Sequence, residues 1–322
     1  MAAMSPSTVG TRSRPDLILR SARLRPLVSH SPAMRSVLAV VEPTARSDAH
    51  VVITGERGSG KQTLARWIHG VSSRSARPLV SLRAEAAAGR SPADDLFGHT
   101  NGTAREFGHL PSCLELAHQG TLFLDGVGGL DLEAQKRLAA VLTSGCYPER
   151  GFASGLELRV ILALTGEPAD EVRAGHVAAE LLTALEPARV HMPPLRERRE
   201  DVPVLAMAVL AEMSDRYQKP VTSFEPDAVR LMLDYRWPGN VRELEHAVER
   251  GVLLSRDDGV AADDLGIHMD GAPTFDTMTL SAVERVLIQK ALVRHAGNVS
   301  RAAKTLGLSR SALYRRLHRH GL

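Results

Sequence analysis

Short apolar runs alternate with amphipathic segments between residues 31 and 195. Four runs are apolar along almost their whole length, as strands buried on both faces of a sheet are, and the segments between them have helical spacing. This alternation favours a parallel sheet with helices on both faces, an α/β fold. The four predicted strands are Val51–Thr54, Leu79–Leu82, Thr121–Asp125 and Arg159–Leu164.

The rest of the chain shows helical patterns only. Amphipathic segments at Asp201–Met213, Pro226–Tyr235 and Gly239–Leu254 predict a small helical domain, and the C-terminus predicts another. No receiver or ligand-sensing domain is expected before residue 31. The expected organisation is a flexible basic arm (1–30), an α/β domain (31–195), a helical domain (196–256), a linker (257–278) and an all-α C-terminal domain (279–322).

Charge is distributed unevenly along the chain. The net charge of +3 combines nine basic and no acidic residues over 285–322, five arginines and one aspartate over 1–30, and 36 acids against 26 bases elsewhere. A basic end on an acidic body is typical of a globular domain joined to a module that binds a polyanion. A solvated basic face is the alternative that charge alone leaves open.

Composition excludes several other classes of protein. Only two cysteines occur, Cys113 and Cys146, without metal-ligand spacing, so a disulfide scaffold is not expected. No apolar run approaches the roughly 20 residues that span a bilayer, and the N-terminus lacks the apolar core of a signal peptide. The sequence predicts a cytoplasmic protein with no membrane partner.

A glycine-rich loop follows the first predicted strand and has the G-x-x-x-x-G-K spacing. In this pattern glycines let backbone N–H groups wrap phosphates, the next helix adds its dipole, and Lys61 reaches the outer phosphates. Gln62 stands where a hydroxyl for Mg²⁺ is usual, and a turn that binds nothing is the alternative. The loop predicts ATP or ADP binding by Gly55, Glu56, Arg57, Gly58, Ser59, Gly60, Lys61 and Gln62.

Asp125 ends the third predicted strand. Proteins with such a loop place a magnesium-orienting Asp at this point. An Asp at a strand end is common by chance, so the interpretation depends on the loop upstream. With that loop, Asp125 is the candidate metal ligand and Mg²⁺ is expected with the nucleotide.

Two short helices at the C-terminus have the spacing of a helix-turn-helix. Asn298 predicts the N-cap of a helix over Val299–Leu306 that Gly307 ends, and Ser309 caps a second helix from Arg310 to His320. A major groove admits such a helix, and arginine suits both phosphates and guanine edges. A basic packing helix is the alternative. The predicted DNA contacts are Ser309, Arg310, Ser311, Tyr314, Arg315, Arg316 and Arg319. Arg310, Ser311 and Tyr314 lie in the first turns, near base edges, whereas Arg316 and Arg319 lie further along, at phosphates.

The segment 279–294 precedes these helices and has an apolar stripe of Leu280, Val283, Leu287 and Ala291. Such a stripe indicates either a dimerisation helix or a core helix. A dimer would present its two second helices about 34 Å apart, to successive major grooves. The expected partner is therefore double-stranded DNA with an inverted-repeat site.

Several motifs occur in a fixed order along the chain. They are Ser31-Pro-Ala-Met-Arg35, the phosphate loop, Leu96-Phe-Gly-His99, Gly120-Thr-Leu-Phe-Leu-Asp125, Pro193-Pro-Leu-Arg-Glu-Arg-Arg-Glu-Asp201 and Trp237-Pro-Gly-Asn-Val-Arg-Glu-Leu-Glu245. From about Ser31 to the C-terminus the chain resembles the AAA+ activators of sigma-54 RNA polymerase, the nitrogen-regulator class of enhancer-binding proteins. The resemblance implies a P-loop AAA+ domain, a helical lid and a Fis-like helix-turn-helix domain, with Arg242 as the lid arginine that touches nucleotide.

The chain departs from that family at parts needed for hydrolysis. The family's water-activating Glu after the strand Asp is here Gly126, its two arginine fingers align with Ala178 and Ala184, and the usual Asn ending the next strand is Thr165. A general base is worth about 10²–10⁴-fold and a finger about 10³–10⁵-fold. We therefore expect nucleotide to bind and to turn over very slowly.

The sigma-54-contacting loop is also replaced. Where the family has Gly-Ala-Phe-Thr-Gly-Ala, this chain has Gly102-Thr-Ala-Arg-Glu-Phe107, and the surrounding segment is one residue shorter. The sequence thus predicts a DNA-binding regulator impaired in ATP hydrolysis and sigma-54 contact, acting as a dimer or a higher AAA+ ring, with an active paralogue or RNA polymerase as further partners. An active sigma-54-dependent ATPase is the alternative, and a DNA-architectural protein is a third hypothesis.

Overall fold

The computed structural model describes residues 27–84, 91–98, 111–147, 155–255, 257–267 and 298–320, together with 284, 287–288, 291–292 and 295. Most of the expected arm, residues 268–278 of the expected linker and the segment Gly102–Phe107 lie outside the described residues. The chain divides into two compact units, Met1–Gly266 and Ile267–Leu322.

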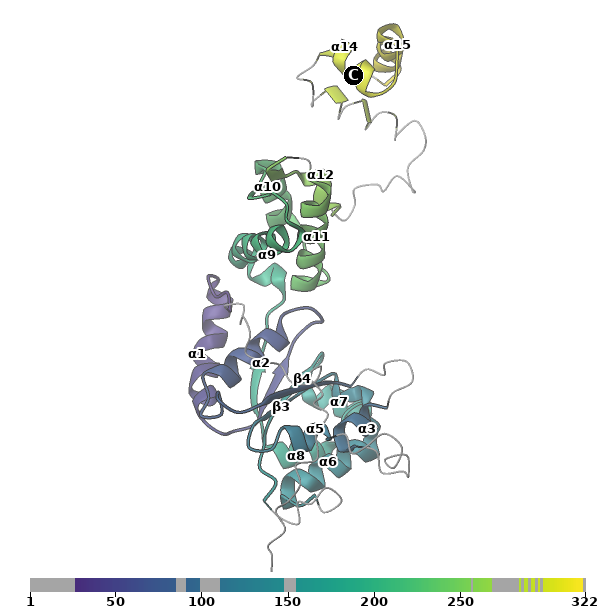
Figure 1. Cartoon of the computed structure of the whole chain (residues 1–322). Coiled ribbons are helices and arrows are strands. Elements are labelled where there is room, and N and C mark those ends of the chain that lie inside the picture. The colour runs from purple at the N-terminus through teal and green to yellow at the C-terminus, as the bar shows by residue number, and fades with distance from the viewer. Residues whose placement is uncertain are drawn as a thin grey trace, which may run out of the picture. The chain divides into compact units, whose positions relative to one another are not determined.

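The first unit contains a parallel sheet of five strands in the order β2-β3-β4-β1-β5 (Figure 1). The four predicted strands are confirmed, and the edge strand β5 was missed. Only Val190 of its four residues is buried, so β5 lacks the continuous apolar run that marks the other strands. The strands are β1 (Val51–Thr54), β2 (Leu79–Arg83), β3 (Thr121–Asp125), β4 (Arg159–Leu164) and β5 (Ala188–His191).

Helices cover both faces of this sheet because successive strand residues point to opposite sides. Val51 and Ile53 pack with α1 and α2, whereas Val52 packs with the helices of the other face. Figure 1 shows α1 and α2 on one side of the sheet and the remaining helices of the domain on the other. The helices are α1 (Pro32–Arg46), α2 (Lys61–Gly70), α3 (Pro92–Phe97), α5 (Cys113–Leu116), α6 (Leu132–Ser144), α7 (Pro168–Arg173) and α8 (Ala179–Leu185).

The helical lid follows the sheet in the same unit. Its three main helices confirm the predicted ones, and Trp237 anchors its core with its indole N–H donating to the Met232 carbonyl oxygen at 2.9 Å. Prolines open α9 and α10 in the first turn, where a missing N–H costs no helical hydrogen bond. The lid elements are η3 (Leu195–Glu197), η4 (Arg199–Asp201), α9 (Val202–Tyr217), β6 (Ser223–Phe224), α10 (Pro226–Asp234), α11 (Asn240–Leu254), β7 (Gly259–Val260) and α12 (Ala262–Leu265).

The second unit contains the predicted helix-turn-helix, α14 (Val299–Thr305) and α15 (Arg310–His320). The Asn298 side chain accepts a hydrogen bond from the Arg301 N–H at 3.1 Å, and Ser309 Oγ accepts one from the Ala312 N–H at 3.2 Å. Both predicted caps are therefore confirmed. The small core is formed by Ile288, Ala291, Ala302, Ala303, Leu313 and Leu317.

One residue of the preceding segment departs from the predicted stripe. Ala291 is buried as expected, but Leu287 is 43% exposed and Ile288, its neighbour, takes the core position. Leu280 and Val283 lie outside the described residues. Across the part of the chain that the structure describes, no helix has the length and apolarity needed to cross a membrane.

Candidate functional site

The glycine-rich loop between β1 and α2 has a backbone that only glycine adopts readily. Gly55, Gly58 and Gly60 have φ values of +144°, +74° and +104°. A Cβ atom on Gly58 would lie 2.3 Å from the Gly239 carbonyl oxygen, so the lid also requires glycine there. Gly60 precedes α2 without a side-chain cap, which leaves the first N–H groups of that helix available to an anion.

Lys61 is the first residue of α2 and is almost fully buried. Its Nζ atom donates hydrogen bonds to the carbonyl oxygens of Gly55 at 2.6 Å and Glu56 at 2.9 Å. Burial lowers the pKa of Lys61, and the nearby Asp125 carboxylate opposes that shift. An anion close to the loop would favour the charged ammonium in the same way.

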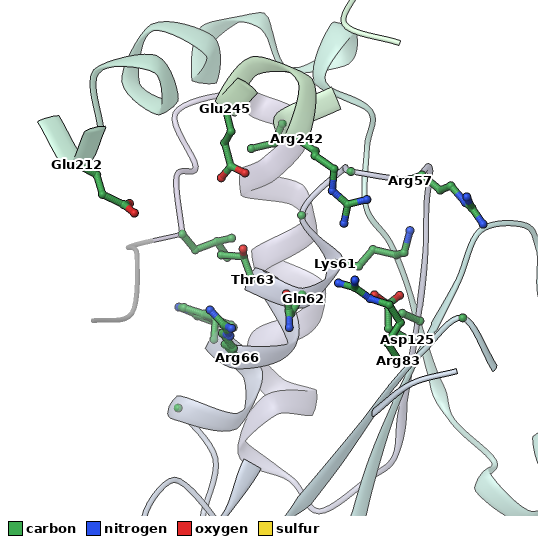
Figure 2. Close-up of a pocket in the computed structure, with 18 of the residues that line it drawn as sticks. Arg57, Lys61, Gln62, Thr63, Arg66, Arg83, Asp125, Glu212, Arg242 and Glu245 are labelled. Atoms are coloured by element: carbon green, nitrogen blue, oxygen red, sulfur yellow. The ribbon is translucent and has the colours of Figure 1, made fainter. Parts of the chain in front are cut away.

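A cleft of about 1430 Å³ opens above the loop. It brings together candidates from four separate parts of the sequence, and in Figure 2 Arg242 faces Lys61 from the lid helix α11. Gly55, Glu56 and Ser59 do not line the cleft, although the sequence predicted them as nucleotide-binding residues. The predicted residues that do line it are Arg57, Gly58, Gly60, Lys61, Gln62, Asp125 and Arg242.

Glu56 braces the loop against the lid. Its carboxylate accepts two hydrogen bonds from Arg196, at 2.6 and 2.9 Å, and one from Asn240 Nδ2 at 3.0 Å. These bonds, those from Arg196 above all, lower the pKa of Glu56 to about 2. Asn240 also donates to the Arg57 carbonyl oxygen, and the Val241 N–H donates to that of Gly58. The loop is thus held in place by the first turn of α11.

Ser59 faces a buried arginine beneath the loop. Arg198 is 3% exposed and donates from Nη2 to the Ser59 carbonyl oxygen. Burial lowers the pKa of Arg198 to about 10. Ser59 Oγ and Arg198 Nε are buried without a hydrogen-bond partner among the described residues. Sequence reasoning assigned no role to Arg196, Arg198 or Asn240, although all three lie in motifs that it quoted.

Four positions align with residues that the family uses for hydrolysis, and they are Gly126, Ala178, Ala184 and Thr165. Gly126 follows Asp125 with φ +73° and ψ +49°, a left-handed conformation that disfavours any residue with a Cβ. Ala178 caps the start of α8 and is 5% exposed, and Ala184 packs against the same core. Thr165 is exposed and lines the cleft. None of these four side chains can act as a base, and none of them is a cation.

The residues at this end of the cleft do not fit a magnesium ion. We use "phosphate end" for the lining residues that come from the loop and from the carboxyl ends of the strands. Asp125 is the single carboxylate among them, and Gln62 supplies no hydroxyl at the position after Lys61, where the loop's Ser or Thr is usual; the hydroxyls that line the cleft are those of Thr63 and Thr165. No group of three or more His, Cys, Asp or Glu residues is placed to hold a metal in the described parts of the chain. Arg83 ends the strand beside that of Asp125, and its side chain lines the same cleft.

The second helix of the helix-turn-helix presents most of its predicted contacts to solvent. Tyr314 is 49% exposed, and the Arg310 guanidinium lies 5.7 Å from its ring centroid. Ser309, Ser311 and Arg315 are exposed as well. The side chain of Arg319 lies outside the described residues.

Arg316 lies in a different environment from the one that the sequence suggested. It forms an ion pair through Nε with Glu284, and Glu284 also accepts a hydrogen bond from His320 Nε2 at 3.1 Å. These two partners, His320 first, lower the pKa of Glu284. Because its side chain is 34% exposed and its guanidinium is paired, Arg316 joins α15 to the segment before it instead of standing free for a phosphate.

Three family models match the chain in succession. A model of the sigma-54 interaction domain matches residues 27–191, one of the AAA+ ATPase lid domain matches residues 196–279, and one of bacterial regulatory proteins of the Fis family matches residues 279–320. Together they cover the sheet, the lid and the helix-turn-helix. The fold predicted from the sequence is thereby confirmed.

Several named proteins are similar to this chain over most of its length. The transcriptional regulatory protein ZraR of Klebsiella oxytoca is 38% identical over 304 residues, which are 91% of this chain and 68% of that protein. The alginate biosynthesis transcriptional regulatory protein AlgB of Pseudomonas putida is 35% identical over 92% of this chain and 67% of its own length. The crystal structure of NtrX from Brucella abortus in complex with ATP is similar, with a TM-score of 0.66 and 29% identity over 93% of this chain and 71% of NtrX. The chain belongs to the family of sigma-54-dependent transcriptional regulators, with an ATP-binding AAA+ domain and a Fis-type DNA-binding domain.

Proposed function

We propose that this protein is a sequence-specific DNA-binding regulator that binds ATP or ADP and hydrolyses ATP very slowly. The observation that carries the proposal is Gly126, which follows Asp125 at the end of β3. A glycine can neither accept a proton nor orient water, and the backbone there is left-handed. The alanines at positions 178 and 184 offer no cation to a neighbouring subunit. The domain therefore serves to sense nucleotide or to support assembly.

Nucleotide binding in this proposal uses the loop and the lid together. The N–H groups around Gly58 and Gly60 and the Lys61 ammonium receive the phosphates, and Arg57 and Arg242 add positive charge. Gly55, Glu56 and Ser59 contribute by holding the loop's shape. NtrX, whose complexes with ADP and ATP are similar to this chain, supports the assignment. The magnesium ion expected at Asp125 is not part of the proposal, because the donors there do not fit it.

DNA binding in this proposal uses the exposed face of α15. Ser309, Arg310, Ser311 and Tyr314 lie at its N-terminal end, where recognition helices approach base edges. Arg315 and Arg319 serve phosphates, and Arg316 keeps α15 in position through Glu284. A dimer formed through residues 279–294 would read an inverted repeat.

The remaining partners are proposed from the positions at which this chain departs from the family's sequence pattern. Because Gly102–Phe107 replaces the family's sigma-54-contacting stretch, we propose that the protein does not activate sigma-54 polymerase by itself. It acts as a repressor, with another form of RNA polymerase, or in a mixed AAA+ ring with an active paralogue. The cytoplasm is the compartment where such partners and DNA occur together.

An equilibrium titration with a fluorescent ATP or ADP analogue tests nucleotide binding by the full chain. The parent protein should bind, and Lys61→Ala should lose at least tenfold in affinity because the loop loses its phosphate-facing cation. Lys136→Ala is the control, since Lys136 is an exposed lysine of α6 that pairs with Glu133. Equal binding by Lys61→Ala and Lys136→Ala would refute the assignment of the loop.

A further inference from the structure

Two side chains of opposite charge end neighbouring strands on the floor of the cleft. Arg83 is the last residue of β2 and Asp125 the last of β3, and the two are register partners in this parallel pair. Register partners of parallel strands point to the same face of the sheet, with backbones about 4.8 Å apart. Figure 2 shows both side chains close together in the cleft, near Lys61. The guanidinium of Arg83 therefore lies at the phosphate end.

The charge of Arg83 is available to a ligand. Its side chain is exposed and lines the cleft, and no hydrogen bond or ion pair engages its guanidinium among the described residues. Arg57, Lys61 and Arg242 line the cleft around it. A planar guanidinium can donate two parallel hydrogen bonds to phosphate oxygens, which an ammonium cannot do in a fixed geometry.

At the same place a divalent cation would find few ligands, and the positive charge of Arg83 would repel it. In P-loop proteins Mg²⁺ is held by the loop's Ser or Thr and by the strand Asp, and it bridges phosphate oxygens. Gln62 removes the first ligand, and the second, Asp125, stands beside the positive charge of Arg83.

We propose that this protein binds ATP or ADP without Mg²⁺, and that Arg83 supplies the positive charge that the metal supplies elsewhere. The inference rests on the proposed nucleotide binding and adds a cofactor requirement to it. Asp125 then serves to balance the positive charge beside the phosphates, where it already favours the charged form of Lys61. Binding without the metal also fits the missing hydrolytic groups, because a bound nucleotide that serves as a structural signal needs no metal-assisted transfer of its phosphate.

The experiment measures the dissociation constant of ADP for the full chain by calorimetry, in buffer with excess EDTA and in buffer with excess Mg²⁺. The parent protein should give values within about threefold of each other. Arg83→Ala should weaken binding at least tenfold in EDTA, a loss expected for a charge-assisted contact. Arg83→Lys keeps the charge without the two parallel N–H donors of a guanidinium. Its ADP affinity in EDTA should therefore lie between those of the parent protein and Arg83→Ala. Arg77→Ala removes an exposed arginine outside the cleft and is the matched control.

The possible outcomes distinguish a failure of this inference from a failure of the proposed nucleotide binding, on which it rests. Tight binding in Mg²⁺ with a loss of tenfold or more in EDTA would overturn metal-free binding and leave nucleotide binding intact. Arg83→Ala binding as tightly as Arg77→Ala in EDTA, with both variants folded by circular dichroism, would overturn the role of Arg83. An absence of ADP binding by the parent protein in either buffer would overturn both proposals.

Discussion

Arg196 donates two hydrogen bonds to Glu56, at 2.6 and 2.9 Å, and so joins the phosphate-binding loop to the segment that leads into the lid. Both side chains are about 40% exposed, and water therefore weakens the pair. Replacing Glu56 by Gln should lower the free energy of unfolding at neutral pH by about 1 kcal/mol or less. Chemical denaturation measures the change, with Glu42→Gln as the control, since Glu42 pairs with Arg46 on the exposed face of α1.

The Glu56 contribution should depend on pH in one direction. Folding lowers the pKa of this carboxyl from 4.5 to about 2, so its stabilisation is complete above pH 4.5 and is lost as the pH falls toward 2. The difference in unfolding free energy between the parent protein and Glu56→Gln should therefore shrink across that range. A difference that stays constant from pH 7 to pH 3 would show that the ion pair contributes nothing.

Gly126→Glu returns the family's glutamate to the position after Asp125, but we do not expect it to restore hydrolysis. Its left-handed backbone should make the substitution cost about 1–2 kcal/mol of stability. ATP turnover should stay near the parent rate, because positions 178 and 184 still lack a cation. Thermal unfolding and an ATPase assay on the same preparation check both expectations. Gly126→Ala is the control for backbone strain. Recovery of rapid turnover by Gly126→Glu alone would contradict the proposal that positions 178 and 184 also limit hydrolysis.

Three arginines of α15 should differ in their effects on DNA binding. Arg310→Ala should relax sequence preference and, if the contact to a base is bidentate, cost about 1–3 kcal/mol. Arg315→Ala should weaken binding to all sequences alike and reduce the log–log salt slope by about one. Arg316→Ala should instead lower the melting temperature of the C-terminal domain, because Glu284 loses one of its two partners and keeps only His320. Equal salt slopes for Arg315→Ala and the parent protein would remove Arg315 from the phosphate contacts.

In vitro transcription tests the proposed loss of sigma-54 contact. The template is a sigma-54 promoter that carries the protein's own footprinted site. With ATP and the protein alone, we expect no open complexes above background, because Gly102–Phe107 replaces the contacting stretch. An active relative on its own template shows that the polymerase is competent. Open complexes that require this protein and hydrolysable ATP would contradict the expectation.

The sequence predicted the elements whose signal is local. Continuous apolar runs marked β1 to β4, and Asn298 and Ser309 marked the helix starts because capping depends on residues three positions away. The edge strand β5 was missed because its burial depends on a neighbour far along the chain. Arg83 was missed for the same reason, since its importance comes from its register with Asp125.

The predicted site residues remain predictions, and the structure adds contacts that the local pattern could not show. The glycine spacing indicated a phosphate-binding loop, but it could not show that Glu56 turns away from the cleft toward Arg196 and Asn240. Charge along α15 likewise could not separate Arg315 from Arg316, because the partner of Arg316 lies 32 positions earlier. In each case a long-range polar contact decides the role of a side chain that the local pattern leaves open.

The central claim is that this regulator binds ATP and hardly hydrolyses it. The most direct test is steady-state ATP turnover by the full chain at saturating ATP, with and without DNA carrying its own site, and with Mg²⁺ present so that the metal is not limiting. From a typical enzyme rate of about 10 s⁻¹ and a loss of about 10²–10⁴-fold for the missing base, we predict turnover below about 0.1 s⁻¹ in both conditions. Turnover of about 1 s⁻¹ or faster, abolished by Lys61→Ala, would contradict the claim.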